Sequence, residues 1–151
     1  MASQAIESHR ENAEVTYGDE MCYEKIQETL KEFELPNGLL PLKDILEVGI
    51  NRKTGFVWAK QTKSTIHVFS AIGKTISYAQ EITAFIEKGK LKKITGVKSR
   101  ELLLWISLDD IYINENDCEM ITGKNTMSGI GLSFPSTAFQ LEEEKMEGGV
   151  Y

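Results

Sequence analysis

Residues that could carry out covalent chemistry are few in this chain and widely separated. The 151 residues include two histidines, His9 and His67, and two cysteines, Cys22 and Cys118. A thiol beside an imidazole would be an activated nucleophile, but no motif places His67 near either cysteine. Two histidines and two scattered cysteines also do not match the spacing of a zinc site. The sequence therefore predicts no catalytic residue, no metal site and no cofactor, and we expect both thiols to be free.

Three short segments resemble functional motifs only in part. Residues 73–75 read Gly-Lys-Thr, as at the end of a phosphate-binding loop, but Val68 stands where the first glycine of that loop belongs. Ser133 follows a glycine by two positions, but Pro135 occupies the place of the second glycine of a nucleophile elbow. The acidic segment over residues 109–119 lacks the central glycine of a calcium-binding loop. We expect a strand turn, an ordinary serine and a solvated loop.

Aromatic side chains on the expected strands are candidates for lining an apolar pocket. These candidates are Phe56, Trp58, Phe69, Tyr78, Phe85 and Trp105. Aromatic residues at alternating positions are also typical of an ordinary core, so both interpretations stay open. Trp105 follows an apolar run, and we expect it in the core.

Basic residues gather around one expected hairpin, in a chain whose two ends are acidic. They are Lys88, Lys90, Lys92, Lys93, Lys98 and Arg100. Such a stripe attracts phosphates, lipid headgroups or an acidic partner, or is neutralised by the acidic flanks. No aromatic residue between Lys88 and Arg100 is available to stack on bases. We expect weak, salt-sensitive attraction to an acidic protein or an anionic membrane surface, and no specific nucleic-acid binding.

The spacing of apolar residues changes near residue 38. Cys22, Ile26, Leu30 and Phe33 share one helical face, which predicts a helix over residues 19–33. The Leu-Pro-Asn-Gly sequence at 35–38 ends this helix. Alternating residues then predict strands over 46–50, 56–58, 65–71, 76–86, 91–97, 101–106, 119–122 and 129–134. We expect a hairpin turn between the first two, in which Gly55 takes the positive φ of a bulge.

About eight strands after one helix predict a mainly β fold, either an antiparallel sandwich or a barrel-like sheet. We expect a flexible arm over residues 1–15, a single β-rich domain over 16–141 and a disordered acidic tail over 142–151. The longest apolar run, residues 102–106, is far shorter than the roughly 20 residues that span a bilayer. The first residues lack the pattern of a signal peptide, so we expect a cytoplasmic monomer.

An ordered series of motifs resembles the plant family called domain of unknown function 538. The series comprises Leu35-Pro36-Asn37-Gly38-Leu39-Leu40-Pro41, Glu47-Val48-Gly49, Thr54-Gly55-Phe56-Val57-Trp58, Ser77-Tyr78, Ile94-Thr95-Gly96-Val97-Lys98, Glu101-Leu102-Leu103-Leu104-Trp105, Phe134-Pro135 and Ala138-Phe139. The resemblance implies a compact β-rich domain with an amino-terminal helix, associated with plant stress responses. The family has been compared with lipid-binding proteins of the bactericidal/permeability-increasing type, and chlorophyll hydrolysis has been proposed for it. Neither comparison assigns a catalytic residue to this chain.

Three functions remain open on the sequence. The leading hypothesis is a non-enzymatic module that binds an apolar or amphipathic small molecule or lipid. The first alternative is a hydrolase, acting on chlorophyll or another ester, and the second is a protein-interaction module that uses the basic surface. An aromatic-lined cavity would favour the small-molecule module, and a nucleophile within reach of His67 would favour the hydrolase. A solid core with an exposed basic face would favour the protein-interaction module.

Overall fold

The computed structural model describes residues 2–141 and consists mainly of strands. In chain order the elements are α1 (Ala2–His9), β1 (Glu14–Tyr17), α2 (Asp19–Glu32), β2 (Ile45–Asn51), β3 (Phe56–Gln61), β4 (Thr65–Phe69), β5 (Lys74–Glu87), β6 (Lys90–Glu101), β7 (Leu104–Ser107), β8 (Asp110–Ile113), β9 (Met120–Lys124), β10 (Gly131–Pro135) and the 3-10 helix η1 (Ser136–Phe139). The prediction of a mainly β, antiparallel fold is confirmed. The expected strand over residues 101–106 is instead divided by a turn between β6 and β7.

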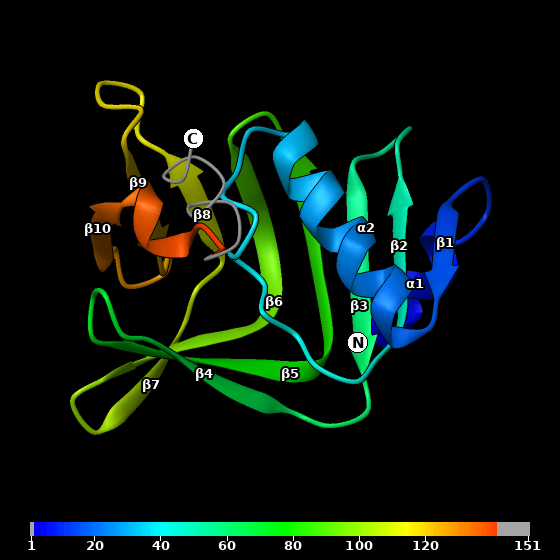
Figure 1. Ribbon diagram of the computed structural model, residues 1–151, viewed down its shortest axis with the longest axis horizontal. Coiled ribbons are helices and arrows are strands. Elements are labelled where there is room, and N and C mark those ends of the chain that lie inside the picture. The colour runs from blue at the N-terminus through cyan, green and yellow to red at the C-terminus, as the bar shows by residue number, and fades with distance from the viewer. Residues whose placement is uncertain (1, 142–151) are drawn as a thin grey trace, which may run out of the picture.

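The strands form one sheet in the order β1-β2-β3-β5-β6-β8-β9-β10, with β4 added to β5 and β7 added to β6. The described residues therefore supply ten strands rather than about eight. Because β1 and β10 are not paired with each other, the sheet curls but does not close into a barrel. The curled sheet surrounds an interior that α2 and the segment after it partly fill (Figure 1).

Bends in the long strands β5 and β6 produce this curl. The pairing of the two strands is irregular between Tyr78 and Thr83. On β6, Gly96 has a φ of 88°, and a Cβ built there would lie 2.5 Å from the Glu81 carbonyl oxygen. Only glycine combines that positive φ with so close an approach of two backbones. The amino-terminal half of β5 thus turns away and pairs with β4, and the carboxyl-terminal half of β6, its far half, pairs with β7.

Apolar residues are buried on both faces of the sheet, because neighbouring side chains of a strand point to opposite sides. On the inner face, Cys22, Ile26 and Leu30 of α2 join a core that includes Val48 and Ala59. On the outer face, α1 packs its fully buried Ile6 against Phe56 and Trp58.

The amino-terminal segment differs from the expected flexible arm over residues 1–15. It forms α1 and β1, and Glu14 to Tyr17 pair with β2. Arg10 fixes the segment through its ion pair with Glu47, at 2.9 Å. The sequence does not indicate this structure, because the segment is short and polar and a single isoleucine, Ile6, makes its main apolar contact. The tail expected over residues 142–151 lies outside the described residues.

Candidate functional site

Two apolar hollows lie inside the curled sheet. Hollow 1 lies between the β4, β5, β6 and β7 end of the sheet and strands β8 to β10, whereas hollow 2 lies between α2 and the strands β2, β3, β5 and β6. Leu40, Val97 and Ile111 line both hollows and separate them. Leu40 belongs to the segment that crosses the interior between α2 and β2 (Figure 1).

Hollow 1 is narrow and almost wholly apolar. It contains about 750 Å³ of empty space, counting the part that opens to solvent, and a cavity of only about 70 Å³ within it is wide enough for the centre of a water molecule. Phe69, Tyr78 and Phe139 contribute its aromatic wall, and Ile130 and Leu132 form an exposed apolar lip. The buried Tyr78 hydroxyl donates a hydrogen bond to the Leu39 carbonyl oxygen at 3.1 Å, and burial raises the pKa of Tyr78 well above its usual range. This side chain therefore stays neutral and is already paired.

Three polar side chains form one rim of hollow 1. Lys74 Nζ lies 2.6 Å from Glu101 Oε1, and Ser99 Oγ donates to Glu101 Oε2 at 2.6 Å. Burial opposes ionisation of Glu101, but the hydrogen bonds from Lys74 and Ser99 outweigh it and lower the pKa of Glu101. A carboxylate with a lowered pKa is a weak base. The trio therefore provides hydrogen bonds and a locally neutral ion pair at this rim.

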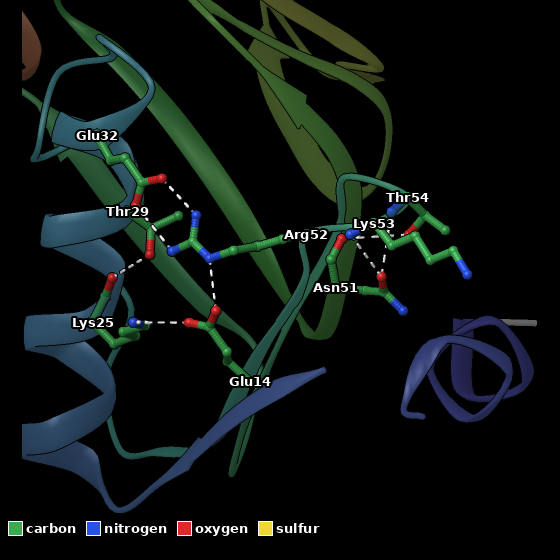
Figure 2. Close-up of polar contacts among 8 residues, drawn as sticks. All are labelled: Glu14, Lys25, Thr29, Glu32, Asn51, Arg52, Lys53 and Thr54. Atoms are coloured by element: carbon green, nitrogen blue, oxygen red, sulfur yellow. Dashed lines mark hydrogen bonds and ion pairs between the residues drawn. The ribbon is translucent and has the colours of Figure 1, made fainter. Parts of the chain in front are cut away.

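Hollow 2 contains about 700 Å³ of empty space on the same measure. Its mouth includes Glu14 of β1 and Lys25 of α2, whose Nζ and Oε1 atoms lie 3.4 Å apart. Arg52 extends this contact by binding Glu14 Oε2 at 2.7 Å and Glu32 Oε1 at 3.0 Å (Figure 2). These ion pairs tie α2 to β1 and to the turn after β2, next to this mouth.

The aromatic candidates separate into three groups. Phe69 and Tyr78 line hollow 1, whereas Trp58 borders hollow 2 but packs its ring on the outer face beside Ile6 and Arg10. Phe56 and Phe85 lie on the outer face beside α1, where the His9 ring stacks on Phe56 at 4.0 Å between centroids.

Trp105 is not in the core, contrary to expectation. It lies on β7 with 38% of its surface exposed and contacts neither hollow. The apolar sequence of residues 102–106 indicates one buried strand, but residues 102 and 103 form a turn.

The rim residues Lys74, Ser99 and Glu101 were missed by sequence reasoning. The alternation of side chains between the two faces of a strand could have indicated that these residues share a face with core residues. Lys74 shares a face of β5 with Ile76 and Tyr78, and Ser99 and Glu101 share a face of β6 with Val97.

The six basic candidates do not form one stripe, because β6 is bent. Lys88 pairs with Glu34 at 3.4 Å and Lys92 with Glu87 at 2.9 Å. Lys90 lies over the Tyr112 ring and Lys93 over the Phe85 ring. Lys98 and Arg100 lie on the far half of β6, which pairs with β7.

The structure does not bring the histidines and cysteines together. Cys22 is buried, its thiol donates to the Thr16 carbonyl oxygen at 3.2 Å, and burial raises its pKa. Cys118 is exposed. His67 lies edge-on to Phe69, and burial and the charge of Lys43 lower its pKa. Within residues 2–141, no group of three or more His, Cys, Asp or Glu side chains could hold a metal ion.

The family model described as protein of unknown function DUF538 matches residues 26–140, so the chain belongs to this family. No curated protein matches the chain. No solved structure matches it either. In the part of the chain that is described, no helix has both the length and the apolar character needed to cross a membrane.

Proposed function

We propose that this protein is a non-enzymatic binding module for a slender amphipathic molecule, and that hollow 1 is its site. The observation that carries the proposal is the combination of an apolar hollow, an exposed apolar lip and one polar rim. Sites for small molecules are mostly apolar and contain a few placed polar groups that orient the ligand. Hollow 1 has this composition, with Lys74, Ser99 and Glu101 as the polar groups.

The lip distinguishes hollow 1 from hollow 2. Ile130 and Leu132 are 50% and 39% exposed, so apolar surface continues from the interior to solvent. The wall of hollow 2 consists mainly of core residues, and ion pairs lie at its mouth. An apolar ligand therefore meets apolar side chains at the lip of hollow 1 but ion pairs at the mouth of hollow 2.

The rim and the width of hollow 1 indicate the class of ligand. Lys74 and Ser99 can donate to a hydroxyl, ester or carboxylate oxygen, while the apolar wall covers a hydrocarbon chain. A narrow hollow favours a single alkyl chain over a broad ring system. Release and uptake then require no bond breaking, in keeping with a rim whose carboxylate is a weak base.

A filled-hollow variant tests this proposal. In Gly123→Leu, the new Cβ would lie 3.6 and 3.7 Å from the Leu108 methyl carbons, which is ordinary contact distance. The rest of the leucine side chain would occupy hollow 1, which Gly123 lines. The matched control is Thr62→Leu, because Thr62 is exposed between β3 and β4 and lines neither hollow.

The measurement is a fluorescence titration with a dansyl-labelled fatty acid. We expect saturable binding by the natural protein and the Thr62→Leu control, and at least about tenfold weaker binding by Gly123→Leu, as when a binding pocket loses space for a few methylene groups. Thermal melts of all three proteins control for folding. Equal binding by Gly123→Leu and the control would reject hollow 1 as the site.

A further inference from the structure

The turn between β6 and β7 exposes a group of leucines. Leu102 and Leu103 form the two-residue turn between the paired residues Glu101 and Leu104. The three leucines are 94%, 86% and 68% exposed, in chain order. Single exposed apolar residues are common on proteins, whereas a contiguous group commonly marks an interaction site. The β6–β7 hairpin reaches outward at the lower left of Figure 1.

Leucine is a poor residue for this turn. Leu102 has a φ of 57°, in the left-handed region that side chains other than glycine, asparagine and aspartate rarely occupy. Two-residue hairpin turns prefer Asn-Gly or similar pairs. Local preference and solubility both disfavour two leucines here, and such a conflict is typical of functional positions.

Residues 102–104 form the leucine tip, and the outer face of the sheet behind this tip is apolar and basic. Strand pairing places Ile66, Ser77, Lys98 and Ser107 in one row across β4, β5, β6 and β7. The neighbouring row contains Val68 and Thr75 on β4 and β5, and Arg100 and Trp105 on β6 and β7. These eight positions include two bases and no acid.

Arg100 and Trp105 connect the two rows to the leucine tip. The Arg100 guanidinium lies over the Trp105 ring, 5.6 Å from its centroid, and its Nε donates to the Leu102 carbonyl oxygen at 3.4 Å. The nearby Glu101 points to the other face, where Lys74 balances its charge. Tryptophan and arginine are both suited to the boundary between hydrocarbon and lipid headgroups.

We propose that residues 102–105, together with Lys98 and Arg100, dock this protein on the surface of an anionic membrane. A projecting tip inserts its leucines below the headgroups, Trp105 lies at the boundary, and the two bases contact lipid phosphates. A convex apolar tip with bases behind it and no acid among them complements an anionic bilayer. This membrane surface is separate from hollow 1, and either proposal can fail without the other.

The test is flotation with vesicles of phosphatidylcholine and phosphatidylserine, compared with phosphatidylcholine alone. The decisive variant is the double substitution Leu102→Asn and Leu103→Gly, in which asparagine tolerates the positive φ of residue 102 and glycine can adopt any φ, so the hairpin stays folded. We expect it to reduce vesicle binding at least about tenfold while the melting temperature stays equal or rises. The control, Met21→Ser, removes an apolar residue of α2 that is 61% exposed and should bind as the natural protein does.

Two further readouts identify the mode of docking. Trp58 is buried, so a blue shift of tryptophan emission on vesicle binding reports Trp105, and it should vanish in Trp105→Phe. The pair Lys98→Gln and Arg100→Gln should remove the preference for phosphatidylserine. Absence of vesicle binding, or binding retained by the Asn-Gly variant, would overturn the proposal. The alternative outcome is a protein that does not bind vesicles but self-associates in sedimentation experiments. If the Asn-Gly variant abolished that self-association, the leucine tip would be a contact with a second copy of the chain.

Discussion

Lys74 Nζ lies 2.6 Å from Glu101 Oε1, which joins the first residue of β5 to the last residue of β6. Both side chains are less than a quarter exposed. The ion pair closes one side of hollow 1 and holds the only carboxylate of the polar rim in its charged form. It therefore contributes both to the stability of the curled sheet and to the polarity of the proposed site.

Removal of one partner of this ion pair is expected to destabilise the fold. Lys74→Met leaves the shielded Glu101 carboxylate with Ser99 alone, and we expect a loss of about 1–3 kcal/mol in the free energy of unfolding. The double variant with Glu101→Leu should recover much of this loss, because no charge is then left unpaired. Urea unfolding of the two single variants and the double variant gives the coupling energy. A coupling energy near zero would show that the two side chains act independently.

The two tryptophans should respond very differently to truncation. Trp58 is buried between α1 and the sheet, and its Nε1 donates to Glu47 Oε2 at 2.7 Å. Trp58→Ala is expected to cost about 3–5 kcal/mol, whereas the exposed Trp105→Ala should cost less than about 1 kcal/mol. Chemical denaturation measures both. A large loss for Trp105 would mean that β7 depends on this ring for its packing.

Gly49 should not tolerate even one methyl group. A Cβ at this position would lie 2.2 Å from Cζ2 of Trp58, an approach that no real Cβ makes. We expect Gly49→Ala to cost about 1–3 kcal/mol through displacement of the ring. The control is Gly131→Ala, whose nearest neighbour lies at 3.5 Å on the flexible Lys124 side chain. Similar melting temperatures for the two variants would contradict the close packing of Trp58 on Gly49.

Arg52 should make part of the stability dependent on acid pH. Its hydrogen bonds lower the pKa of Glu14 and of Glu32. A lowered folded pKa stabilises the fold above the unfolded value, near 4.3, and this contribution is lost as pH falls through the folded pKa. Since all three side chains are more than 40% exposed, Arg52→Gln should cost less than about 1 kcal/mol at neutral pH.

Urea unfolding at several pH values tests this expectation. The difference between the natural protein and Arg52→Gln should shrink below a pH of about 4. Lys53→Gln is the control, because this neighbouring exposed lysine has no acidic partner among residues 2–141. A difference that persists unchanged in acid would mean that Arg52 stabilises the turn by packing alone.

Periodic segments could be predicted from the sequence, and so could the turn at Gly55. The spacing of Cys22, Ile26 and Leu30 correctly indicates α2 and its buried face. Alternation indicates β5, and Gly55 has the expected positive φ of 83°. These features depend on neighbours in the chain, which is why local patterns reveal them.

Features that depend on distant contacts could not be predicted. The burial of Ile6 requires the outer face of β3, and the polar rim requires the pairing of β5 with β6, which sets Lys74 opposite Glu101. The turn at Leu102 was hidden because its residues contradict the usual preference for glycine or asparagine. This turn also exposes the leucines and separates Trp105 from the core.

Photo-crosslinking is the decisive experiment on whether an alkyl chain occupies hollow 1. A fatty acid that carries a diazirine near the end of its chain would be bound, activated by light and located by peptide mass spectrometry. We expect saturable labelling of residues that line hollow 1, such as Ile106, Leu132 and Phe134, and loss of this labelling in Gly123→Leu. Saturable labelling confined to α2 or to the leucine tip, or labelling that does not saturate, would contradict the claim.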